Sequence, residues 1–205
     1  METIINGINR MAGSYHAQDI FQDWVQMAGI SISNQLFYDQ RLEDQYLTLA
    51  KKYTTEQLKE MCRWTARLVE LFEDDINDYL GSIYMMLNAG NSRTGQFFTP
   101  FHVCVLMAKA VLTGYSGGKI TANEPSVGGG ANILAAAKEI QRLGYDYQSL
   151  LDVVAQDLDY KCVWMSYLQF SFAGISAICV QGNTLQNEIN FTLVTPMYCL
   201  RGVSP

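Results

Sequence analysis

The placement of proline is the feature that most constrains how this chain can fold. The four prolines of the 205-residue sequence are Pro100, Pro125, Pro196 and Pro205, so none precedes residue 100. Proline breaks helices, and its absence leaves room for long ones. Apolar residues recur at helical spacing within 21–28 and again within 58–72, where Thr54 and Gln57 form a typical capping pair. We therefore expect residues 1–90 to form an all-helical N-terminal region.

The second half of the sequence alternates between strand and helix patterns. Short apolar runs that predict strands are separated by amphipathic or alanine-rich stretches that predict helices, an order typical of a parallel sheet with crossover helices. The predicted strands are 119–124, 151–155, 176–181 and 189–194, and the predicted helices are 100–112, 131–143 and 159–172. We expect an α/β domain over 91–205, with Thr99 capping the first of its helices.

Composition and charge limit the classes of function. The hydrophobic fraction of 49% is large enough for a sizeable core. The formal charge of −6, from 14 basic and 20 acidic residues, makes the chain a poor nucleic-acid binder unless it has a local basic surface or a basic partner. Basic side chains do gather in 51–67, where they form either a phosphate-binding face or an ordinary solvated helix face.

Cysteine, histidine and the N-terminal residues add three further expectations. The five cysteines form no CxxC pair, and the two histidines lie far from any cysteine pair, so we expect reduced thiols and no metal site. The N-terminus lacks a basic-then-apolar signal peptide, and no apolar run is long enough to span a membrane. These features predict a cytoplasmic protein that is not inserted in a membrane.

Three segments carry candidate chemistry. Gly128, Gly129 and Gly130 lie between a predicted strand, which ends at Glu124, and a predicted helix, which begins at Ala131. Glycines there let the backbone approach a ligand, and the helix start offers free N–H groups; the alternative is a plain tight turn. Asp157 comes just after the next predicted strand, where an acidic residue accepts ribose hydroxyls or, alternatively, caps a turn. The third segment is GQFFTP, 95–100, whose paired phenylalanines are otherwise typical core residues.

The order of these motifs resembles a known family. GQFFTP, then EPSVGGG (124–130) and AQDLD (155–159) together resemble the adenine-specific DNA methyltransferases, in particular the modification subunit of type I restriction systems. The resemblance covers roughly residues 70–200. It implies a Rossmann-like S-adenosylmethionine-dependent methyltransferase sheet over 91–205. Because the family continues with three more strands, we expect this sheet to be truncated at its C-terminal end.

The same resemblance implies a binding site for S-adenosylmethionine. Residues 96–100 would close over the methionine end of the cofactor, Glu124 would face its amino group, and the glycine loop would lie along its backbone. Asp157 would bind the ribose, and Asn183 would contact the adenine in place of the family's usual acid. The implied cofactor-binding residues are Gln96, Phe97, Phe98, Thr99, Pro100, Glu124, Gly128, Gly129, Gly130, Ala131, Asp157 and Asn183.

The family's catalytic signature, Asn/Asp-Pro-Pro-Tyr/Phe, is altered here. By the resemblance the catalytic residues would be Thr195, Pro196 and Tyr198, with Thr195 in place of the amide or acid and Met197 in place of the second proline. A threonine hydroxyl is a shorter and weaker acceptor for the amine of a flipped adenine. Three hypotheses follow. The chain is an adenine-N6 methyltransferase acting on double-stranded DNA, or a methyltransferase with another substrate. Alternatively it is an inactive pseudo-methyltransferase that keeps the cofactor fold and acts as a regulator or by binding a protein partner, which could be a second copy of the chain.

Overall fold

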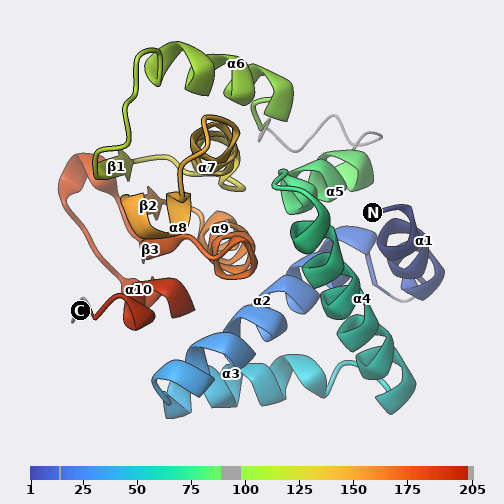
Figure 1. Ribbon diagram of the computed structural model, residues 1–205. Coiled ribbons are helices and arrows are strands. Elements are labelled where there is room, and N and C mark those ends of the chain that lie inside the picture. The colour runs from blue at the N-terminus through green and yellow to red at the C-terminus, as the bar shows by residue number, and fades with distance from the viewer. Residues whose placement is uncertain (14, 89–97, 203–205) are drawn as a thin grey trace.

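The computed structural model describes residues 1–13, 15–88 and 98–202, which form an α/β structure with a four-stranded mixed sheet (Figure 1). The helices in this part of the chain are α1 (Glu2–Met11), α2 (Ala17–Leu36), α3 (Gln40–Ala50), α4 (Thr55–Asp74), α5 (Tyr79–Asn88), α6 (Phe101–Val111), α7 (Ala131–Arg142), α8 (Tyr147–Leu150), α9 (Tyr160–Ala173), the 3-10 turn η1 (Thr184–Gln186) and α10 (Pro196–Leu200). The strands are β1 (Ile120–Glu124), β2 (Leu151–Asp157), β3 (Ser176–Gln181) and β4 (Phe191–Val194). None of these described helices is long and apolar enough to cross a membrane.

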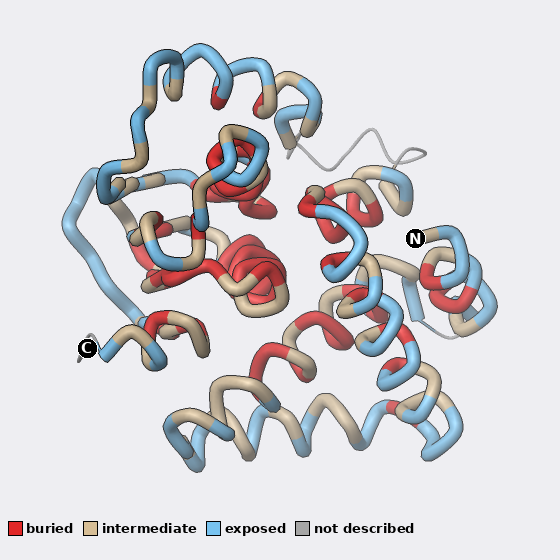
Figure 2. The backbone as a smooth tube through the Cα atoms, viewed as in Figure 1, coloured by how far each residue is buried: buried red, intermediate tan, exposed pale blue. Residues whose placement is uncertain are grey.

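The helices α1–α5 form as the sequence predicts. Helix α4 begins with the expected capping box, in which the Thr54 hydroxyl accepts from the Gln57 N–H at 3.3 Å and the Gln57 side chain accepts from the Thr54 N–H at 2.8 Å. Trp24 of α2 and Trp64 of α4 pack edge to face, with ring centroids 5.6 Å apart. Helix α2 also packs on α9, so a single hydrophobic core joins the helical region to the sheet (Figure 2).

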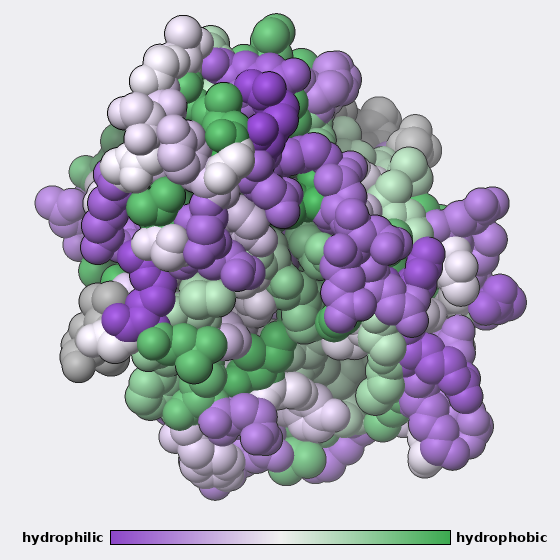
Figure 3. All heavy atoms as spheres, in the orientation of Figure 1, coloured by the Kyte–Doolittle hydropathy of each residue, from purple (hydrophilic) through white to green (hydrophobic). Residues whose placement is uncertain are grey.

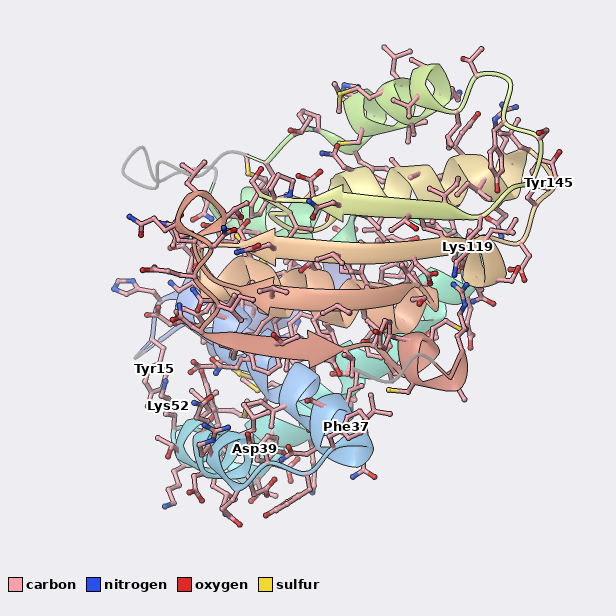
Figure 4. The ribbon with its side chains drawn as sticks, turned by 90° about the vertical axis from the view of Figure 1, so that its left-hand side faces the viewer. Tyr15, Phe37, Asp39, Lys52, Lys119 and Tyr145 are labelled. Atoms are coloured by element: carbon pink, nitrogen blue, oxygen red, sulfur yellow. The ribbon has the colours of Figure 1, made fainter. Side chains whose placement is uncertain are left out.

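The strands follow the order β1-β2-β3-β4, and the first three are parallel, with α7 and α9 as their crossover helices. Strand β4 pairs with β3 in the antiparallel direction, so in Figure 4 three arrows point one way and the fourth points back. A parallel strand needs a crossover of about a dozen residues or more. The connection from β3 to β4, residues 182–190, is shorter than that.

The two faces of the sheet differ in cover. Leu151, Val153 and Ala155 occupy alternate positions of β2 and are buried, and α7 and α9 lie on one side of the sheet (Figure 1). By the strand register Thr121, Val154 and Thr192 share the opposite face, which is turned to the viewer in Figure 4. Thr121 and Thr192 are exposed, and Val154 is 37% exposed. The helices that pack on the buried face hold the strands in place, and with them the loops that follow β1, β2 and β3.

Candidate functional site

The candidate site lies where the three parallel strands end. Glu124, Asp157 and Gln181 are the last residues of β1, β2 and β3, so the loops that follow them meet at one edge of the sheet. Two hydrogen bonds tie these loops together: the Thr184 hydroxyl donates to the Pro125 carbonyl at 2.9 Å, and the Gly182 N–H donates to the Asp157 carbonyl at 3.0 Å. In open α/β sheets, ligands bind at this carboxyl edge.

The glycine loop has a backbone that other residues would not adopt without strain. Gly128 and Gly130 have φ values of +55° and +101°, in the left-handed region. Gly130 is also the N-cap of α7, and a Cβ placed there would lie 2.7 Å from the ring of Phe170. Ala131 is the first residue of α7 and is buried. The loop is therefore a defined turn that presents backbone groups at the start of a helix.

Asp157 fixes this turn. Its Oδ2 accepts from the Gly128 N–H and its Oδ1 accepts from the Asp159 N–H, both at 2.9 Å. Asp157 thus acts as a turn-capping residue, and Asp159 caps α9 by accepting from the Lys161 N–H. Each carboxylate oxygen still has a free lone-pair direction, because a carboxylate has about four acceptor sites. Asp157 is therefore able to accept a ligand hydroxyl while holding the loop.

Glu124 and Asn183 make local contacts at the same edge. The Glu124 carboxylate accepts from the Asn132 amide at 3.0 Å and lies beside the start of α7. Asn183 accepts from the Leu185 N–H at 3.1 Å and donates to Gln186 at 3.0 Å, so its side chain caps the short turn η1. Both side chains belong to the edge, but both already have partners of their own.

Part of the GQFFTP segment also reaches the glycine loop, although Gln96 and Phe97 lie outside the described residues. The Phe98 ring packs on Tyr84, with centroids 4.9 Å apart, and a Cβ placed at Gly128 would lie 3.2 Å from that ring. The structure thus brings Phe98, Gly128 and Asp157 together. Thr99 does not cap α6, because the N-cap is Pro100 and no side chain bonds there; the Thr99 carbonyl instead accepts from the Cys104 thiol at 3.8 Å.

Sequence reasoning missed a buried carboxyl group beside the loop. Asp78 precedes α5 and is 3% exposed. The Gln169 amide donates to Asp78 Oδ1 at 2.8 Å and to the Gly129 carbonyl at 2.6 Å, and the Gly81 N–H donates to the same Oδ1 at 2.9 Å. Burial raises the pKa of the Asp78 carboxyl above its ordinary value, while the bonds from Gln169 and Gly81 act in the opposite direction.

A cavity of about 450 Å³ opens next to this carboxyl group. Its walls come from Asp78 and α5 on one side and from residues 98–102 on the other, and include Ser82, Met85, Phe98 and Phe101. No local pattern identifies this site in the sequence. Asp78 looks like an ordinary helix cap, and only the tertiary packing of α5 against α9 places it beside Gly129.

The three residues for which the resemblance implies a catalytic role lie elsewhere. Because β4 is antiparallel, Thr195 is level with Ala177 near the start of β3, about 13 Å along the strand from its carboxyl end. The Thr195 hydroxyl is buried, donates to the Ile175 carbonyl at 2.7 Å and accepts from the Ala177 N–H at 3.0 Å. Tyr198 is buried in α10. The structure does not bring these residues to the glycine loop.

Pro196 belongs to a second, apolar cavity. It begins α10 and lines a space of about 490 Å³ together with Phe172 and side chains of α2 and α4, such as Met27 and Met61. Figure 3 shows apolar side chains gathered on this side of the molecule, between α10 and the helical region. Pro196 is thus part of the contact between the sheet and the helices.

The basic side chains of α4 are paired rather than free. Lys59 lies 2.8 Å from Glu56, Arg63 lies 2.8 Å from Glu60, and Arg67 lies 2.6 Å from Glu70. Lys52 is held by Asp23 at 2.9 Å. This face therefore carries little net positive charge for a phosphate backbone.

Comparison with known proteins found no matching family model, no matching curated protein and no matching solved structure.

Proposed function

We propose that this chain binds S-adenosylmethionine at the carboxyl edge of β1 and β2, and that it acts as a non-catalytic methyltransferase-like protein. The observation that carries the proposal is the glycine turn Gly128–Gly130, held by Asp157 and covered by Phe98. When bound, the cofactor supplies an activated methyl group on its sulfonium. In this proposal Asp157 accepts the ribose hydroxyls, and the turn lies along the chain that joins the ribose to the amino acid.

The residues present fit such a ligand. The left-handed glycines let the backbone come close to it, and the Asp157 oxygens keep acceptor capacity beside the turn. Asn183 lies on the next loop, where an amide can donate to or accept from an adenine edge, and Glu124 is at the start of α7. These contacts support the proposal.

The geometry favours the non-catalytic hypothesis over DNA methylation. Methyl transfer requires the acceptor amine and the methyl group to be close and aligned. Thr195 lies at the other end of β3, and its hydroxyl is already used by two buried backbone groups. The net charge of −6 and the paired basic residues of α4 also disfavour binding to duplex DNA. We therefore propose that function comes through a protein partner or a second copy of the chain.

Binding is tested by calorimetric titration of the purified chain with S-adenosylmethionine. Replacing Asp157 by Asn weakens a charge-assisted bond, and we expect the affinity to fall about 10-fold or more. The matched control is Asp146→Asn, because Asp146 caps α8 at the opposite end of β2 by accepting from Gln148. No binding by the wild-type chain, or equal affinity in the two variants, would remove the proposed site.

The proposal that the chain does not transfer the methyl group needs a separate experiment. Radiolabelled S-adenosylmethionine is incubated with the chain and adenine-rich duplex DNA, and we expect no transfer of label. Transfer of label that is lost in a folded Tyr198→Ala variant but kept in Thr192→Val would overturn the non-catalytic proposal and restore the catalytic hypothesis. Light scattering of the same sample tests whether the chain forms a dimer.

A further inference from the structure

The cavity beside Asp78 has the composition of a site for an organic cation. Its one acidic group is almost completely buried, and the walls that face it include Met85, Phe98 and Phe101. A buried carboxylate is costly unless a positive charge or several hydrogen bonds compensate it. Aromatic faces add attraction for a cation that lies within about 6 Å of the ring.

Within residues 1–13, 15–88 and 98–202, no positively charged side chain is paired with the Asp78 carboxylate. No lysine, arginine or histidine of these ranges forms an ion pair with Asp78. The exposed His102 lines the same cavity, but the contacts that reach the carboxylate come from the Gln169 amide and the Gly81 N–H. Lys138 lies over the Phe101 ring at 5.8 Å, but its ammonium is held by Asp75 at 2.6 and 2.7 Å. Within the described residues no side chain neutralises Asp78, so a bound cation would favour the ionised form of this carboxyl group.

The cavity also adjoins the glycine loop. Asp78 and the Gly129 carbonyl share the Gln169 amide, and Phe98 lies both on the cavity wall and against Gly128. A ligand that runs along the loop would therefore place one of its ends in this cavity. The motif resemblance assigns the amino group of the cofactor to Glu124, but Glu124 bonds to the exposed Asn132 in the first turn of α7.

We infer that Asp78 is the counter-ion for the cationic end of the ligand, an ammonium or sulfonium group bound in the cavity between α5 and residues 98–102. This inference rests on the proposed function and names the residue that holds the charged part of S-adenosylmethionine. Gln169 has a positioning role: it fixes the carboxylate and the Gly129 carbonyl with one amide group. Because Gln169 belongs to α9, this helix contacts both the carboxylate that would bind the ligand and the glycine loop.

The test compares three ligands on the full chain by calorimetry. S-adenosylmethionine carries both cations, S-adenosylhomocysteine carries only the ammonium, and 5′-methylthioadenosine carries neither. Asp78→Asn keeps the helix cap and the shape of the side chain but removes the charge. We expect this variant to bind S-adenosylmethionine about 10- to 100-fold more weakly, the usual range for a charge-assisted bond, and to bind 5′-methylthioadenosine with unchanged affinity. If the affinity for S-adenosylhomocysteine falls to a similar extent, the group that Asp78 binds is the ammonium. If that affinity does not change, the group is the sulfonium.

Two matched variants control the experiment. Asp74→Asn removes a nearby but exposed carboxylate at the end of α4, and we expect all three affinities to stay the same. Glu124→Gln tests the competing assignment, and a selective loss in this variant but not in Asp78→Asn overturns the inference. If Asp78→Asn does not fold, Ser82→Leu fills the cavity from α5 instead, and it must lower the affinity for S-adenosylmethionine more than for 5′-methylthioadenosine.

The outcomes separate the inference from the proposed function. If the wild-type chain binds none of the three ligands, the proposed function fails. If it binds S-adenosylmethionine but Asp78→Asn binds it equally well, the proposed function stands and the inference about Asp78 is wrong.

Discussion

Replacing Thr195 by valine separates a structural role from a catalytic one. The Thr195 hydroxyl satisfies the Ile175 carbonyl at 2.7 Å and the Ala177 N–H at 3.0 Å, and Thr195 is fully buried. Valine leaves both backbone groups without this partner. Each orphaned buried group costs about 1–3 kcal/mol, so we expect the free energy of unfolding to fall by about 2–4 kcal/mol after allowing for the extra apolar burial of the valine methyl.

Urea unfolding followed by tryptophan fluorescence measures this change, and a thermal scan should show a melting temperature about 5–15 °C lower. Thr192→Val is the control on the same strand, because Thr192 is exposed and its replacement should alter stability by less than about 0.5 kcal/mol. A Thr195→Val variant as stable as the wild type would refute the reasoning. So would a loss of S-adenosylmethionine affinity in that variant while it remains folded.

Three further predictions concern the loop, the buried carboxyl and the thiols. Gly130→Ala places a side chain at a left-handed φ of +101° and 2.7 Å from the Phe170 ring, so we expect a lower melting temperature than the wild type, measured by thermal scan. Because burial raises the pKa of Asp78, the folded state holds the Asp78 proton more tightly than the unfolded state does. The stability of the wild type should therefore decline as the pH rises above the ordinary aspartate range. Urea titrations at several pH values should show that Asp78→Asn lacks this decline. Alkylation of the native chain, followed by mass spectrometry, should label the exposed Cys62 and spare Cys179, where burial raises the pKa to about 12.

The elements that sequence predicted well are those that depend on neighbours in the chain. The capping box of Thr54 and Gln57 joins residues three apart, and the glycine loop follows directly from its place between a strand and a helix. The predicted strands and crossover helices after residue 118 were confirmed for the same reason. The role of Asp157 in holding Gly128 was less accessible, because turn capping and ligand binding use the same residue type.

The position of Asp78 depended on packing that no local pattern encodes. Its bond to Gln169 joins residues 91 apart, and its bond network to Gly129 requires α5 to pack on α9. A sequence read segment by segment therefore finds a helix cap, and only the assembled fold shows a buried carboxyl group at a cavity. The apolar cavity at Pro196 was missed for the same reason, since its walls come from both halves of the chain.

The direction of β4, by contrast, was open to prediction from the sequence. A connection limited to 182–190 is too short to return to the other end of the sheet through a crossover, so the next strand has to run back along β3. An antiparallel β4 then delivers Thr195 to the start of β3, where its hydroxyl closes the end of the ladder. The number of residues in one loop thus decides whether Thr195 faces the glycine turn or supports the sheet, and here it supports the sheet.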